Sequence, residues 1–208
     1  MKTLLTFIIT AFILATCGSD IAAAKTLLIN KDRVIDISGP IKSTTMKVPA
    51  AQLTKYMKTS GPIYIIIDSG GGEVLTGVQF ITLMHRAQAR GRRIVCVVNN
   101  FAMSMAFGIL TQCDRRYAFG SSFLLWHKVR QMAMMMVITR HKGRVWEHQI
   151  GILDDYLDHL IFNAVKVPKK YFDFASNNNI VHTGQHIKKI SPKFMILIDD
   201  FKVIKRSK

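Results

Sequence analysis

Apolar side chains fall into short strand-like runs and longer helical stretches that alternate along the chain. Residues 63–68 are a β-branched run between turn residues, a pattern typical of a buried parallel strand. Residues 73–90 then place apolar side chains at helical spacing, and Gly91 ends that helix before the apolar run at 94–98. A strand, a helix and a second strand in succession predict an α/β domain with a parallel sheet and right-handed crossovers.

The same patterns extend this prediction toward both ends of the chain. Strands are expected over residues 26–30, 34–38, 116–119, 123–126 and 194–199, and helices over 48–58, 104–112, 143–165 and 183–189. No internal repeat or low-complexity linker separates these segments. We therefore expect residues 25–208 to form one domain.

The composition limits the classes of protein and partner. Hydrophobic residues make up 49% of the 208 positions and only 5 are Pro, which excludes a disordered or collagen-like chain. The formal net charge of +16 favours anionic partners without selecting one. The arginines at 86, 90, 92 and 93 and the basic tail are not interleaved with aromatic residues that would stack on bases. We expect no specific nucleic acid partner, and an anionic membrane surface stays an alternative.

The first 24 residues have the features of a secretory signal peptide. Lys2 supplies the positive end, residues 4–15 are apolar and uncharged, and Ala22–Ala24 offer small residues for cleavage. We therefore expect an exported protein, periplasmic or secreted. The apolar stretch is short for a membrane span, so an uncleaved anchor is the alternative. Residues 14–17 also resemble a lipobox, with Thr16 before Cys17.

Two cysteines, Cys96 and Cys113, remain after such a cleavage. They can pair in an oxidising compartment. Because Cys96 lies in an apolar run that predicts a buried strand, we expect buried free thiols instead. No Cys/His cluster has the spacing of a zinc site, so no metal is expected.

Candidate chemistry follows two of the predicted strands. Gly70, Gly71 and Gly72 lie between a strand and a helix, where exposed amide groups can bind a phosphate or an oxyanion, although a plain tight turn fits equally well. Ser104 begins an apolar helix directly after the next strand, a position that suits either a helix cap or a nucleophile. His127 follows 23 positions later and can serve as a base near neutral pH.

In combination these segments resemble a known family. Ile-Asp-Ser-Gly-Gly-Gly-Glu-Val at 67–74, Ala-Met-Ser-Met-Ala-Phe at 102–107 and Leu-Leu-Trp-His at 124–127 are similar to motifs of the Clp proteolytic subunit. The wider Clp/crotonase clan of serine peptidases also includes signal peptide peptidase A. Weaker similarity reaches residues 32–41 and 181–186. The resemblance implies a Clp/crotonase-like fold, with a parallel sheet of repeated β-β-α units and a helical C-terminal part.

The resemblance also assigns site residues. It makes Ser104 the nucleophile and His127 its general base. It assigns the backbone N–H groups of Gly72 and Met105 to an oxyanion hole.

The family's third catalytic member is an acidic residue a little before the tail helix. Counting back from Thr183 makes Asp173 the candidate. Asp154, Asp155 and Asp158, on the preceding predicted helix, are the alternatives.

These assignments imply a serine endopeptidase that forms an acyl-enzyme without a metal or organic cofactor. Clp subunits usually work with a cytosolic ATP-dependent unfoldase, from which export would separate this chain. We therefore expect cleavage of small or unfolded substrates without ATP, by a homo-oligomer if the analogy with the family holds.

Two other functions remain open. A catalytically impaired Clp-fold protein that acts in binding or assembly is the main alternative. A crotonase-type acyl-CoA enzyme would use carboxylates for proton transfer, whereas Ser104 and His127 favour a peptidase.

Overall fold

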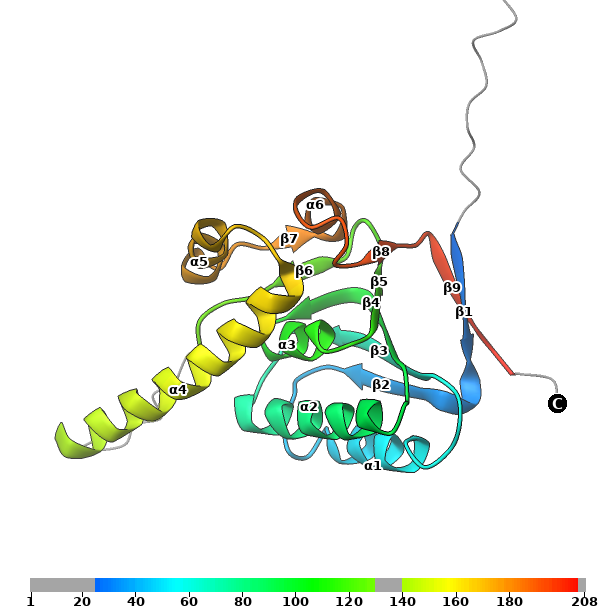
Figure 1. The fold of residues 1–208 in the computed structure, drawn as a ribbon, viewed down its shortest axis with the longest axis horizontal. Helices are drawn as coiled ribbons and strands as arrows, with labels where there is room; N and C mark the ends of the chain where they lie inside the picture. The colour runs from blue at the N-terminus through cyan, green and yellow to red at the C-terminus, as the bar shows by residue number, and fades with distance from the viewer. Residues whose placement is uncertain (1–24, 130–139, 206–208) are drawn as a thin grey trace, which may run out of the picture.

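The computed structural model describes residues 25–129 and 140–205, so the predicted signal peptide at 1–24 lies outside the described residues. The strands are β1 (Thr26–Asn30), β2 (Val34–Ser38), β3 (Ile63–Ser69), β4 (Ile94–Met103), β5 (Arg115–Ala118), β6 (Phe123–Leu125), β7 (His182–Thr183), β8 (Ile196–Leu197) and β9 (Asp200–Ile204). The helices are the 3-10 helix η1 (Lys31–Arg33) and α1 (Lys47–Tyr56), α2 (Val74–Ala89), α3 (Met105–Thr111), α4 (Arg140–Val165), α5 (Lys169–Asn178) and α6 (Gly184–Ile190). Figure 1 shows their arrangement.

The main sheet has the strand order β2-β3-β4-β5-β8, and each neighbouring pair in that order is parallel. The long strand β4 pairs with β5 through Val95–Val98 and with β6 through Phe101–Met103. Among the strands of the described residues, only β7 runs antiparallel, against β6. The predicted α/β class with a mostly parallel sheet is confirmed.

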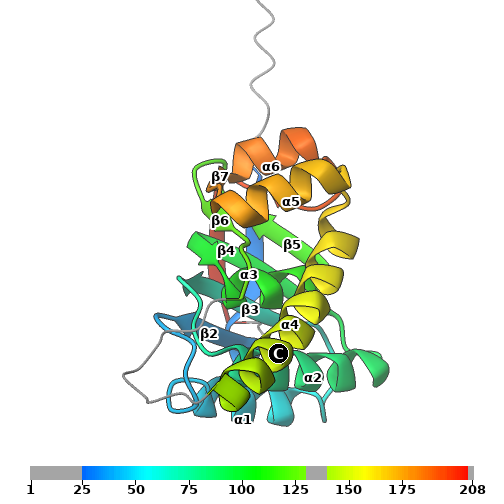
Figure 2. The same cartoon turned by 90° about the vertical axis from the view of Figure 1, so that its left-hand side faces the viewer.

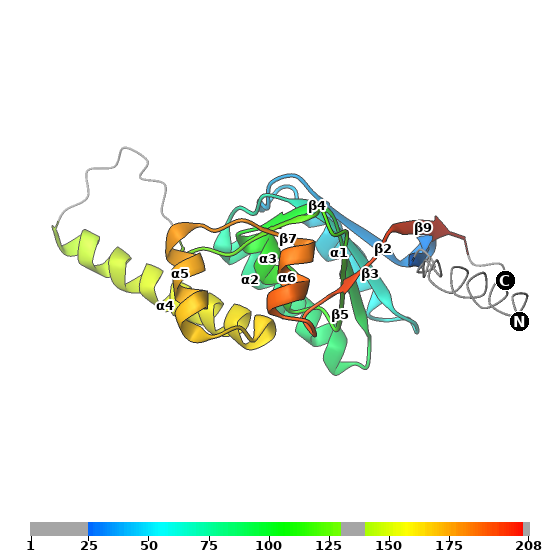
Figure 3. The ribbon, with the colours of Figure 1, turned by 90° about the horizontal axis from the view of Figure 1, so that it is seen from above.

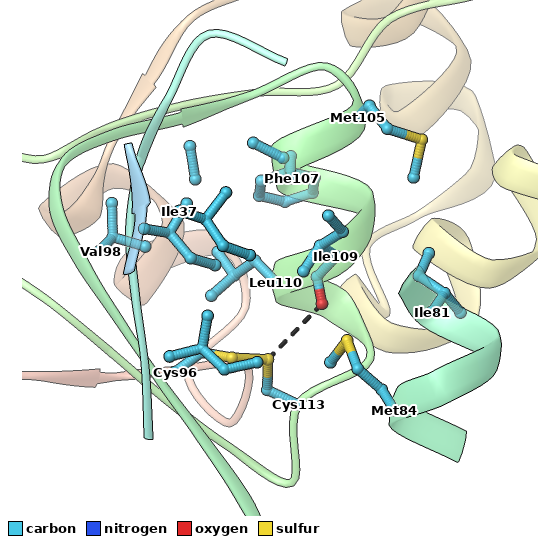
Figure 4. Close-up of a cluster of buried hydrophobic side chains, with 14 of the residues drawn as sticks. Ile37, Ile81, Met84, Cys96, Val98, Met105, Phe107, Ile109, Leu110 and Cys113 are labelled. Atoms are coloured by element: carbon cyan, nitrogen blue, oxygen red, sulfur yellow. Dashed lines mark hydrogen bonds between the residues drawn. A yellow bond between two sulfur atoms is a disulfide. The ribbon is translucent and has the colours of Figure 1, made fainter. Parts of the chain in front are cut away.

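The main core lies between this sheet and the helices. Strand β3 buries every second residue, with Ile63, Ile65 and Ile67 fully inaccessible, as alternation in a pleated strand requires. Helix α2 buries Phe80 and Met84 against the same layer. Every residue of the short helix α3 is buried, so α3 lies inside the core (Figure 4). The helix that follows Ser104 is therefore packed on all sides.

The expectation of free thiols is wrong, because Cys96 and Cys113 form a disulfide (Figure 4). Cys96 lies on β4, and Cys113 follows α3, which returns the chain beside that strand. The two Cα atoms are 5.9 Å apart, within the range that a disulfide spans. Both residues are buried. The bond closes a loop that contains Ser104 and all of α3.

Strands β1 and β9 form a separate parallel pair at the side of the molecule opposite α4 (Figures 1 and 3). Ile29 of β1 packs with Val97 and Ile198 in a small second cluster. The sequence pattern predicted β1 but no strand at β9. The final strand was expected at 194–199, and only Ile196–Leu197 of that range forms one.

The C-terminal part is helical. Helix α4 extends away from the sheet, with α5 and α6 near its C-terminal end (Figures 2 and 3). Helix α5 was not predicted, and it buries Phe172 and Ala175. No helix in the described ranges is long and apolar enough to cross a membrane.

Candidate active site

The glycine loop after β3 is held against the segment that follows β2. The Ile41 N–H donates to the Gly71 carbonyl at 2.8 Å, and the Glu73 N–H donates to the Ile41 carbonyl at 2.8 Å. The buried Ser69 hydroxyl accepts from the Gly71 N–H at 3.1 Å. The Gly72 N–H takes part in none of these bonds.

Two positions in this loop require glycine. Gly71 has a φ of 96°, and a Cβ there would lie 2.6 Å from Ser104 Cβ. Gly72 has a φ of 151°, and its Cβ would lie 2.1 Å from the Ile41 carbonyl oxygen. Any side chain here would therefore displace the backbone. Gly71 therefore lets the loop approach Ser104 closely, and Gly72 lets it approach the Ile41 backbone.

Ser104 stands between β4 and α3 in a strained backbone conformation. Its φ of 54° and ψ of −126° lie in a region that residues other than glycine rarely adopt. Such strain costs on the order of 1–3 kcal/mol and concentrates at functional sites. The Ser104 N–H donates to the Leu125 carbonyl at 2.9 Å, so β6 fixes the turn. The next N–H, that of Met105, is in the first turn of α3, where no acceptor exists within the helix.

His127 is positioned by Trp126, which follows β6 and is buried. The Trp126 ring stacks on Phe107 of α3 at 5.4 Å and on Phe172 of α5 at 5.7 Å between centroids. The indole N–H donates to the Phe172 carbonyl at 3.4 Å. Because Phe107 lies on the helix that Ser104 begins, one aromatic stack ties the segment of His127 to that of Ser104.

A pocket of about 60 Å³ brings four of the predicted site residues together. Its lining residues are Gly72, Val74, Ser104, Met105, Gly108, His127, Val129, Leu157 and Ile161. Ser104 and His127 are both partly exposed, as groups that meet a substrate must be. No hydrogen bond joins the Ser104 hydroxyl to His127 among the described residues, and such bonds are often long before substrate binds.

Asp173 lies elsewhere. It is on α5, does not line this pocket, and its carboxylate is paired with Lys169 one helical turn away. Its assignment as the third catalytic member stays a prediction. Sequence reasoning did not identify Lys128, whose carbonyl oxygen lies 2.6 Å from His127 Nδ1.

Lys128 also links the site to α4. Its ammonium group pairs with Asp154 at 3.1 Å and with Asp158. Burial raises the pKa of Asp158. Burial alone would lower the pKa of Lys128, but the hydrogen bonds to Asp158 and Asp154 outweigh it and raise that pKa. The lysine therefore stays charged.

A comparison with models of known protein families shows which family the chain belongs to. The Clp protease family model matches residues 19–141, which is more than half of the sequence and includes the glycine loop, Ser104 and His127. The chain belongs to the Clp protease family. A comparison with curated proteins finds no match. Membership in the Clp protease family points to a peptidase that acts on proteins and assembles into oligomers, and the α/β architecture agrees with a Clp/crotonase-like fold.

No group of three or more His, Cys, Asp or Glu side chains that could hold a metal ion occurs in the described part of the chain. The chemistry that this pocket supports rests on a hydroxyl, an imidazole and backbone amides.

A buried histidine next to the aromatic stack makes stability depend on pH. His182 is fully inaccessible and stacks on Trp126 at 4.6 Å. Burial, and then the nearby His186, lower the pKa of His182 from its ordinary value of 6.5 to about 4. Between these values the unfolded chain binds a proton that the folded chain does not. Folding is therefore most stable above pH 6.5 and loses stability as the pH falls toward 4.

We expect the free energy of unfolding in urea to be about 2 kcal/mol lower at about pH 5 than at about pH 7 from this group alone. His182→Phe keeps a ring in the stack and removes the titration, so its stability should fall less between the two pH values. His159→Gln, at an exposed position, is the control and should behave as the wild type does. An equal pH dependence in His182→Phe and wild type would contradict this assignment.

Proposed function

We propose that this protein is an exported serine endopeptidase that hydrolyses peptide bonds through an acyl-enzyme, without ATP. The observation that carries the proposal is the strained Ser104, which shares one pocket with His127 and with the amides of Gly72 and Met105. Nucleophile, base and oxyanion donors are the parts that acyl transfer needs. Membership in the Clp protease family supplies the expectation of a peptide substrate.

In the first half of the reaction His127 Nε2 removes the proton of the Ser104 hydroxyl as the Ser104 oxygen attacks the substrate carbonyl carbon. The carbonyl π electrons move to its oxygen, and the N–H groups of Gly72 and Met105 donate to the resulting oxyanion. The oxyanion then reforms the carbonyl, and the C–N bond breaks. The leaving amine takes the proton from His127, which leaves an acyl ester on Ser104.

In the second half a water molecule attacks the ester. His127 takes a proton from that water, and the same two amides hold the second oxyanion. When this intermediate breaks down, the Ser104 oxygen leaves and recovers its proton from His127. The products are a carboxylic acid and an amine, and no redox change or cofactor is required.

The disulfide supports export. Buried disulfides persist in oxidising compartments and are rare in the cytosol, and Cys96–Cys113 closes the loop that contains Ser104. Such a compartment supplies no ATP to drive the unfolding of substrates. We therefore propose substrates that are small or already unfolded. We propose a homo-oligomer as the working form. Cleavage after Ala24 is part of the same proposal, and N-terminal sequencing of exported protein tests it.

The experiment that tests the proposal is hydrolysis of a fluorescently labelled unfolded protein and of a fluorogenic peptide by the purified chain, with and without ATP. We expect equal rates in both conditions, and loss of hydrolysis in His127→Ala. No hydrolysis in either condition would contradict the peptidase assignment. Hydrolysis that occurs only in the presence of ATP would contradict the independence from ATP.

A further inference from the structure

The second ring nitrogen of His127 has a partner other than a carboxylate. His127 Nδ1 lies 2.6 Å from the Lys128 carbonyl oxygen, and a carbonyl can only accept, so the Nδ1–H donates. This bond fixes the neutral tautomer with a free lone pair on Nε2, which is the nitrogen that a general base must present to a serine.

The carbonyl that receives this bond belongs to the peptide group between Lys128 and Val129. The N–H of that same group donates to Asp154 Oδ1 at 2.7 Å. The carbonyl and N–H of a trans peptide point in opposite directions within one plane. His127, the peptide group and the Asp154 carboxylate therefore form a hydrogen-bonded chain in that order.

Three further features hold this chain in place. The second oxygen of Asp154 pairs with the Lys128 ammonium at 3.1 Å, and Asp158 binds the same ammonium group. The side chains of Asp154 and Asp158 are less than one-fifth exposed, so solvent screens these pairs only partly. A carboxylate on the N–H of a peptide group also polarises its carbonyl and makes it a stronger acceptor.

We propose that Asp154 is a positioning residue for the base: it orients His127 through the Lys128–Val129 peptide group, in the place where a triad would have a carboxylate on the imidazole. The proposal rests on the proposed function for its catalytic meaning. It differs from the sequence-based assignment of Asp173, whose carboxylate is paired with Lys169 and, among the described residues, has no hydrogen bond to His127 or to the Lys128–Val129 peptide group. The role of Asp158 and the Lys128 side chain is to hold Asp154.

The first readout does not depend on activity. Nitrogen-15 NMR of histidine-labelled full-length protein distinguishes the two neutral tautomers, and His127→Gln identifies the His127 signal among the 7 histidines. At a pH where the ring is neutral, we expect the wild type to hold the Nδ1–H tautomer. Asp154→Ala should shift His127 toward the other tautomer. Asp155→Ala, on the same helix but exposed, is the matched control and should leave the signal unchanged.

The second readout is kinetic. Asp154→Ala should lower kcat between about 10- and 100-fold with little change in KM, because a misplaced base slows chemistry more than binding. Asp154→Asn keeps an oxygen that can accept the Val129 N–H but loses the oxygen that pairs with the Lys128 ammonium, so it should restore part of kcat relative to Asp154→Ala. This rescue separates positioning from a general loss of packing at α4, and circular dichroism of each variant shows whether it is folded.

The outcomes are distinct. An Nε2–H tautomer for His127 in the wild type, or a larger loss of kcat in Asp173→Ala than in Asp154→Ala, would overturn the proposal. The expected tautomers in a protein that hydrolyses no peptide would leave the positioning of His127 intact and contradict the proposed function alone.

Discussion

Replacement of Ser104 by alanine is expected to remove peptide hydrolysis and leave the fold intact. Loss of a serine nucleophile lowers kcat by as much as about 10⁶-fold, because no other group can form the acyl ester. Stability should change little, since the Ser104 hydroxyl has no hydrogen-bond partner among the described residues. Steady-state kinetics beside urea unfolding of the same preparation measures both effects.

The control for that variant is Ser60→Ala, which changes an exposed serine in the turn after α1. It should keep the wild-type rate. If Ser104→Ala hydrolysed peptides as fast as Ser60→Ala does, the nucleophile would have to be another residue. The assignment of Gly72 and Met105 to the oxyanion hole would then also be wrong.

Removal of the disulfide is expected to have the second largest effect. Cys96 and Cys113 are 17 positions apart, and a bond that closes a loop of this size stabilises a fold by about 3 kcal/mol. Cys96→Ala with Cys113→Ala should therefore lower the melting temperature by roughly 6–12 °C. The melting temperature of wild-type protein in reductant should approach that of the double variant.

This experiment also bears on the site, because the closed loop contains Ser104, and α3 holds the Met105 amide. We expect kcat to fall along with stability in the double variant. Mass spectrometry of the Cys96–Cys113 peptide pair under non-reducing conditions shows whether the bond is present. An unchanged melting temperature in reductant, with the pair still linked beforehand, would contradict a stabilising role.

The sequence pattern predicted most elements because local signals mark them. Alternating isoleucines and flanking glycines define β3, and its limits were predicted to within one residue. Strand β4 runs further than predicted, to Met103, because Asn99 and Asn100 interrupt the apolar run. Those amides reach Asp68 on β3, a pairing that depends on the sheet already being formed.

The elements that were missed depend on distant contacts. Helix α5 reads as a polar, asparagine-rich segment, and the buried ring of Phe172 against Trp126 gives it a place in the fold. Strand β9 carries charged residues and pairs with β1 at the other end of the chain. Cys113 likewise meets Cys96 only because α3 returns to β4. Local periodicity cannot register any of these contacts.

The site residues also divide into those that sequence motifs predicted and those that depend on distant contacts. Ser104, His127 and the glycine loop follow strands of one parallel sheet, whose carboxyl ends lie along one edge, so a motif search could place them together. Asp173 was chosen by counting from a distant motif, a procedure that does not detect its pairing with Lys169. The contact of Asp154 with the Val129 N–H depends on how α4 packs, and no motif marks it.

The central claim is that Ser104 is an activated nucleophile, and labelling with a fluorophosphonate probe tests it most directly. The probe forms a stable ester with a serine only where a base and oxyanion donors activate the hydroxyl. We predict that the full-length protein takes up the probe and that peptide mass spectrometry places the adduct on Ser104, with no labelling of His127→Ala. Folded wild-type protein that takes up no probe, or that carries the adduct on another residue, would contradict the account.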